Sequence, residues 1–121
     1  MDYRRILRYQ NVQLTHDIVE TVHDETRRIQ KHYPHTLSCS VSLSKPHRKH
    51  HKGDGVRAQV SLALPGRRLV STKDASGHSE SENALTAILD AFDAAERMAH
   101  AHLQRRHPGR TRLRQFEPVA A

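Results

Sequence analysis

The histidines are the first residues in this sequence whose type and spacing could do chemistry. His47, His50 and His51 fall within one short polar segment, and eight further histidines are scattered along the chain. Clustered imidazoles can bind Zn²⁺ or Ni²⁺, but a structural site needs about four ligands at fixed spacing. No cysteine or well-placed carboxylate completes such a set in this segment. We therefore expect no physiological metal site and no other cofactor, with a histidine-based metal-handling protein as a minor alternative.

Nucleophilic and acid–base catalysis have little support in the sequence. Cys39, the only cysteine, falls on the apolar side of an alternating segment, where a free cysteine is usually a small buried residue. Asp90, Asp93 and Glu96 share part of a helical face and are better explained as solvated charges. Gly-rich phosphate loops, nucleophile-elbow serines and HExxH motifs are absent from the sequence. We predict that the protein is not an enzyme and has no catalytic residues.

The net positive charge is the strongest chemical signal in the sequence. Twenty Lys and Arg residues stand against thirteen Asp and Glu residues, which gives the 121-residue chain a formal charge of +7. A protein this basic commonly binds a polyanion, because Lys and Arg release the counterions condensed on phosphates. A basic surface that serves only solubility is the simpler alternative.

Basic residues gather in three regions, two on predicted helices and one in a loop between predicted strands. Three such regions in one small domain favour a phosphate-binding surface. The chain has only three Tyr, two Phe and no Trp, so recognition of the shape and backbone of folded RNA suits it better than base stacking. The predicted RNA-binding residues are Arg27, Arg28, Lys31, Arg48, Lys49, Lys52, Arg97, Arg105 and Arg106.

Four segments are predicted to be strands, and they cover residues 4–10, 37–43, 56–64 and 68–73. The second alternates apolar and polar side chains without exception, and the third repeats that pattern. Alternation over this length is typical of a strand with one buried face. It predicts that Leu37, Cys39, Val41 and Leu43 point into the core. The segment 68–73 alternates poorly, so we place it at an edge of the sheet.

Two longer segments are predicted to be amphipathic helices. Thr15 stands where an N-cap belongs, and Pro34 disfavours a helix that continues past Tyr33. The apolar stripe of this helix consists of Ile18, Val19, Val22, Ile29 and Tyr33. The second helix is predicted to begin near Ser81 and to end before Pro108. Its stripe consists of Leu85, Ile88, Leu89, Phe92, Ala95, Ala99 and Leu103.

Together these elements predict an α+β fold in the order β-α-β-β-β-α. One apolar face on each element implies a two-layer sandwich, with both helices packed on one face of a four-stranded sheet and the serine-rich face exposed to water. We expect one domain over residues 1–107 and a basic, flexible tail over 108–121. The sequence contains no apolar run long enough to span a bilayer and no secretory signal, so we expect a cytoplasmic protein without membrane contact.

Several short stretches also resemble one known family. They are Asn11-Val12-Gln13-Leu14-Thr15 running into Ile18 and Val22, the pair Arg28-Ile29 with Tyr33, and Ala87-Ile88 with Glu96-Arg97. In order and spacing they resemble the ribosome hibernation-promoting factors, also called ribosomal subunit interface proteins, over roughly residues 4–106. The short segment after the second helix is similar to the short forms of that family. The chain departs from the family pattern where Tyr9-Gln10 replaces a glycine and where Glu25 stands in place of a basic residue. It also departs in the second helix, which is lysine-rich in the family but here has Asp93, Ala94, Ala95, His100 and His102 around Arg97.

The resemblance implies a fold similar to double-stranded-RNA-binding domains and a non-enzymatic role. Family members bind the small ribosomal subunit and its rRNA at the decoding channel, block mRNA and tRNA, and silence idle ribosomes under stress. Arg28 and Arg97 would correspond to contacts with rRNA phosphates. No small-molecule substrate is implied, and the oligomeric state stays open, with a monomer expected. The alternative is a general structured-RNA-binding module with no preference for ribosomes.

Overall fold

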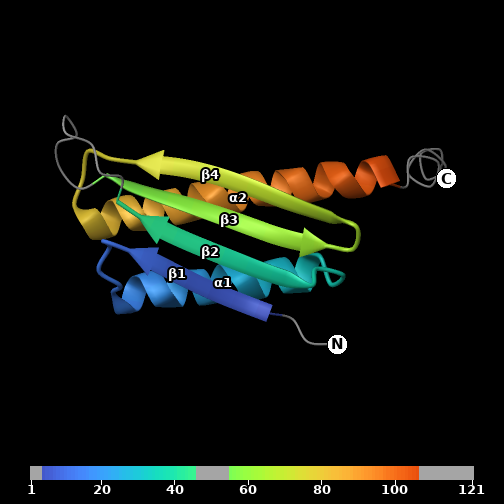
Figure 1. The fold of residues 1–121 in the computed structure, drawn as a ribbon, viewed down its shortest axis with the longest axis horizontal. Helices are drawn as coiled ribbons and strands as arrows, with labels where there is room; N and C mark the ends of the chain where they lie inside the picture. Colours follow the sequence, from blue (N-terminus) through green and yellow to red (C-terminus); the bar gives the residue numbers. More distant parts are fainter. Residues whose placement is uncertain (1–3, 46–54, 107–121) are drawn as a thin grey trace.

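The computed structural model describes residues 4–45 and 55–106, with only the backbone for Arg105 and Arg106. It contains one four-stranded sheet with two helices against one of its faces (Figure 1). The elements are β1 (Arg4–Gln10), α1 (His16–His32), β2 (Ser38–Ser44), β3 (Val56–Leu64), β4 (Arg67–Ala75) and α2 (Glu80–Arg106). The predicted α+β order β-α-β-β-β-α is confirmed, and the bounds of β1 and β3 match the prediction. The predicted boundary between domain and tail lies outside the described residues.

The strands lie in the order β1-β2-β3-β4, so β4 is an edge strand, as its poor alternation predicted. β1 pairs with β2 in parallel, and the other pairs are antiparallel. A parallel pair needs a crossover connection, which α1 supplies here. The register places Leu7 beside Val41 and Val41 beside Val60, which aligns the apolar side chains on the face that the helices cover.

The core lies between the sheet and the helices. Cys39, Val41 and Leu43 of β2 are buried, as predicted, and α2 buries Ile88 and Phe92 against the sheet. Three alanines of α2 that were not predicted, Ala84, Ala87 and Ala91, are also fully buried. Their small side chains allow the helix backbone to approach the strands closely.

Four predicted core positions are wrong: Leu37, Val19, Leu89 and Leu103 are exposed. Leu37 precedes β2 and its buried alternation, and Val19 lines the hollow beside β1 instead of the core. Leu89 does not lie on the side of α2 whose buried alanines pack against the sheet. Leu103 lies in the last turns of α2, which extend beyond the strands (Figure 1).

Both helices begin with side-chain caps. The Thr15 hydroxyl accepts a hydrogen bond from the Ile18 amide at 3.2 Å, so the predicted N-cap is confirmed. Ser79 and Glu82 form a capping box, in which each side chain binds the other residue's amide. This box explains why α2 begins at Glu80, one residue before the predicted start.

Glu80 fastens the start of α2 to the β1–α1 connection and to the end of β2. Its carboxylate accepts the Gln13 amide at 2.9 Å and the Lys45 ammonium at 3.0 Å. The hydrogen bond from Gln13, and after it the one from Lys45, lowers the pKa of Glu80 from its ordinary value. Ionised Glu80 therefore stabilises the contact of the start of α2 with the β1–α1 connection and with Lys45 after β2.

Candidate nucleic-acid interface

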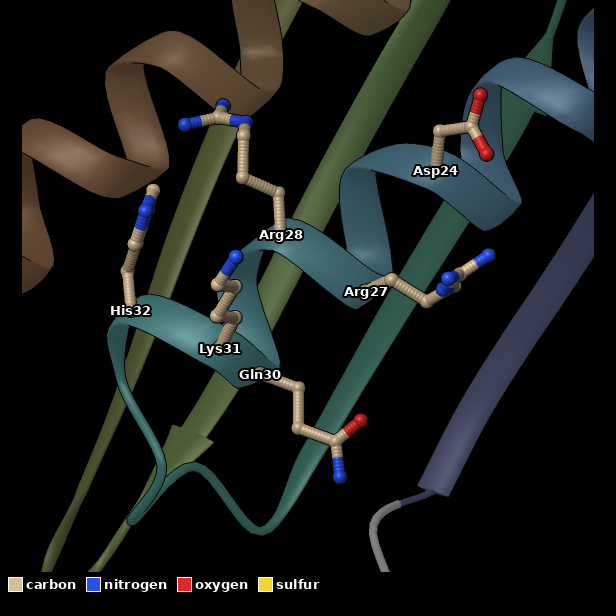
Figure 2. A pocket seen from close by; sticks show the side chains of 6 residues that line it. All are labelled: Asp24, Arg27, Arg28, Gln30, Lys31 and His32. Atoms are coloured by element: carbon tan, nitrogen blue, oxygen red, sulfur yellow. The ribbon is translucent and has the colours of Figure 1, made fainter.

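The second half of α1 brings together three of the predicted RNA-binding residues. Arg27, Arg28 and Lys31 are spaced so that a helix places them near one another. With Asp24, Gln30 and His32 they line a shallow, open hollow of about 650 Å³ (Figure 2). Arg27 and Lys31 are exposed to solvent, as a phosphate contact requires.

Arg28 is already paired with two carboxylates. Its guanidinium donates to Glu25 at 2.8 Å and, across to the other helix, to Glu96 at 2.5 Å. The hydrogen bond to Glu25 is the main reason that the pKa of Arg28 is raised, and the bond to Glu96 adds to it. Figure 2 shows the Arg28 side chain directed toward α2. Arg28 therefore links α1 to α2, and two nearby carboxylates already compensate its charge.

Arg97 of α2 has a partner as well. Its guanidinium lies 3.3 Å from the Asp93 carboxylate, and both side chains are more than two-thirds exposed. Such an exposed pair contributes little to stability and leaves the guanidinium accessible to another anion. Arg97 and Asp93 line a second hollow of about 300 Å³ with Tyr33, Glu96 and His100. Burial raises the pKa of Tyr33, and its hydroxyl lies 3.4 Å from the Glu96 carbonyl oxygen.

Two of the departures from the family pattern thus contact the two arginines that the resemblance singled out. Glu25 binds Arg28, and Asp93 binds Arg97. Both acidic residues lie close in sequence to their partners, and each lowers the net charge that its arginine presents to a ligand. The assignment of Arg28 and Arg97 to RNA phosphates stays a prediction.

The other predicted site residues fall where side chains are not described. Arg48, Lys49 and Lys52 lie outside the described residues, together with His47, His50 and His51. Only the backbone of Arg105 and Arg106 is described, at the end of α2. Within residues 4–45 and 55–106, three or more potential metal ligands do not gather at any point. Over the same ranges, the helices are too short or too polar to cross a bilayer.

The sheet contains basic residues that the sequence reasoning missed. The four strands have one acidic residue, Asp74, and seven basic ones: Arg4, Arg5, Arg8, Arg57, Arg67, Arg68 and Lys73. The two helices, by contrast, contain nine Asp and Glu residues and only six Lys and Arg residues. These strand residues form no single run in the sequence, and the signal that could have found them is a charge count by element.

The architecture and its surface define a small two-layer β-α-β-β-β-α protein with a strongly basic sheet. The family model described as Sigma 54 modulation protein / S30EA ribosomal protein matches residues 6–107. The chain therefore belongs to this family, and the resemblance to ribosome hibernation-promoting factors is confirmed at the family level.

Two solved structures share the fold. The N-terminal domain of Protein Y from Thermus thermophilus superposes with a TM-score of 0.58 at 20% identity, over 81% of this chain and 94% of that one. A ribosomal subunit interface protein from Coxiella burnetii gives a TM-score of 0.55 at 11% identity, over 79% and 98%. A search of curated proteins found no match.

Proposed function

We propose that this protein is a ribosome-binding translation inhibitor. It occupies the decoding channel of the small ribosomal subunit through basic contacts to rRNA, and so blocks mRNA and tRNA while the ribosome is idle. The observation that supports this most strongly is membership of the S30EA family over residues 6–107. The fold shared with a protein described as a ribosomal subunit interface protein agrees with it.

The proposed mechanism is steric and electrostatic. A rigid two-layer domain fills the space in which mRNA and tRNA bind, and its Lys and Arg residues bind the phosphates that line that space. Inhibition of this kind makes and breaks no covalent bond, so it requires no catalytic group. A protein that acts on ribosomes in this way works in the cytoplasm.

Co-sedimentation with ribosomes and isolated subunits, across a salt series, tests the proposal. We expect saturable binding of one protein per small subunit, weakened by salt and competed by mRNA together with tRNA. Binding that does not saturate, or that equals the binding to an equal mass of duplex RNA, would identify a general RNA-binding module and contradict the ribosomal role.

A further inference from the structure

The face of the sheet opposite the helices has four arginines and one carboxylate. In Figure 1 both helices lie behind the sheet, and the strands present their other face to the viewer. We call this the open face, and the register assigns to it Arg4, Ile6, Arg8 and Gln10; Ser38, Ser40, Ser42 and Ser44; Arg57, Gln59, Ser61 and Ala63; and Arg68, Val70, Thr72 and Asp74. On β2 and β3 these residues alternate with the buried ones along the whole strand.

The charges of the open face lie mostly at its margins. Arg4 and Arg68 end the same cross-strand row, with Ser38 and Ala63 between them. Three strand spacings separate their Cα atoms by about 14 Å. Arg8 lies four residues along β1 from Arg4, about 13 Å away. The spacing is wide enough for each arginine to bind a different phosphate.

The pairing of these arginines differs from that of the helix arginines. Among the residues that the structure describes, Arg4 and Arg8 have exposed side chains and no ion pair. Arg68 donates to the Ser61 hydroxyl at 2.9 Å, which leaves its charge uncompensated. Only Arg57 is paired, with Asp74 at 2.8 Å. Four arginines thus stand against one carboxylate, and three of the four have no acidic partner in the described ranges.

The centre of the open face is rich in hydroxyl groups. Ser38, Ser40, Ser42 and Ser44 occupy every outward position of β2, and Ser61 and Thr72 continue the hydroxyl surface on β3 and β4. Hydroxyls donate hydrogen bonds to phosphate oxygens and to the 2′-hydroxyl of ribose. Short side chains also keep the centre low, so that a rounded nucleic-acid backbone can approach while the longer arginines reach it from the margins.

Charge and polarity argue against other occupants of this surface. A second copy packed face to face would bring arginines against arginines, which is unfavourable for like charges. A membrane surface would need apolar side chains to insert, but Ile6 and Val70 lie at opposite ends of one row, separated by Ser40 and Ser61. The surface is complementary to a polyanion with many hydrogen-bond acceptors.

We propose that the open face binds the sugar–phosphate backbone of structured RNA and contributes more to affinity than the helices do. The inference rests on the proposed function, since it names the surface through which the protein engages the ribosomal RNA. It predicts contacts to the backbone without base recognition, because serine and arginine spaced along a sheet read shape and charge.

Two triple variants with equal charge change test the inference. The first, Arg4→Glu with Arg8→Glu and Arg68→Glu, reverses three charges on the open face. The second, Arg5→Glu with Arg67→Glu and Lys73→Glu, reverses three exposed charges on the same strands, at positions that the register assigns to the opposite side. Circular dichroism and thermal melting of both variants establish that each is folded before binding is measured.

Affinity for small subunits and for a free RNA duplex is then measured across a salt series. We expect the open-face variant to lose at least about tenfold in affinity, and its log–log salt slope to fall by about two to three. The opposite-side variant should lose less, since it retains every open-face arginine. Equal losses would show that only net charge matters, and no loss in the open-face variant would exclude the surface; either result overturns the inference.

The same experiment separates this inference from the proposed function. If the wild-type protein binds small subunits and the open-face changes leave its affinity unaffected, the proposed function stands and the open face is excluded as the binding surface. If the wild-type protein does not bind ribosomes but binds the RNA duplex through the open face, the proposed function is wrong and the open face stands as an RNA-binding surface. A third variant, Ser40→Asp with Ser42→Asp, tests the centre, and we expect it to weaken binding although every arginine is retained.

Discussion

The helix layer and the sheet layer of this protein differ in their balance of basic and acidic residues. On α1 and α2, basic residues are outnumbered by carboxylates, and Arg28 and Arg97 each have an acidic partner nearby. The strands contain seven basic residues and one acidic residue. The partly buried pair of Arg28 with Glu96 contributes to the stability of the fold, whereas unpaired charges are available to a partner. The comparison assigns Arg28 chiefly to stability and the arginines of the open face chiefly to binding.

Both layers depend on the core between them, and its loss gives the largest expected effect. Phe92 is the largest fully buried side chain and lies on the side of α2 that faces the sheet. We expect Phe92→Ala to lower the free energy of unfolding by about 3–5 kcal/mol, because it removes apolar contacts and leaves a cavity. Urea denaturation measures this, with exposed Leu89→Ala as the matched control at less than about 1 kcal/mol. Similar losses in the two variants would contradict the assigned packing of α2.

Arg28 tests whether the helix layer uses its charge for stability. Arg28→Glu would place a third carboxylate beside Glu25 and Glu96, so we expect a loss of about 1–2 kcal/mol after allowing for solvent screening. The neighbouring change Arg27→Glu makes the same charge change at an exposed position and should cost less than about 0.5 kcal/mol. Chemical denaturation of the pair, at low and moderate salt, compares them. If Arg27→Glu is the more destabilising, Arg28 is not an interhelical link.

Glu80 provides a pH-dependent test of the same layer. Its pKa is lower in the folded protein than the ordinary value of 4.5, so its ionised form stabilises the fold above that pH. The stabilisation is lost as pH falls through the lowered folded-state pKa. We expect Glu80→Gln to cost about 1 kcal/mol at pH 7 and to converge with wild type in stronger acid.

Thermal melts between pH 7 and pH 3 measure this convergence. Glu82→Gln serves as the control, since Glu82 binds only within its own capping box among the described residues. A constant difference between Glu80→Gln and wild type across that range would mean that the charge of Glu80 contributes nothing.

The sequence predicted the elements well because each strand and helix repeats its own local pattern. The alternation of Val56–Leu64 gave β3 its bounds, and Thr15 marked the start of α1. The charge pattern could not be predicted in the same way. Arg28 and Glu96 are 68 residues apart, and they meet only because the two helices pack on the same face. Arg4 and Arg68 share a row only because the strands lie in chain order, which periodicity does not specify.

The smallest expected effect separates binding from stability at a single residue. Arg8 is exposed on the open face and lies beside Ser42, so Arg8→Gln should change the free energy of unfolding by less than about 0.5 kcal/mol. If Arg8 binds one phosphate, the same change should reduce the log–log salt slope of RNA binding by about 0.7–0.9. Arg5 lies three residues before Arg8 on the same strand, and its side chain is assigned to the opposite side. Arg5→Gln should therefore leave the slope almost unchanged. Equal slopes for Arg8→Gln and wild type would mean that Arg8 does not contact the RNA. A changed melting temperature would mean that the charge of Arg8 contributes to the stability of the fold.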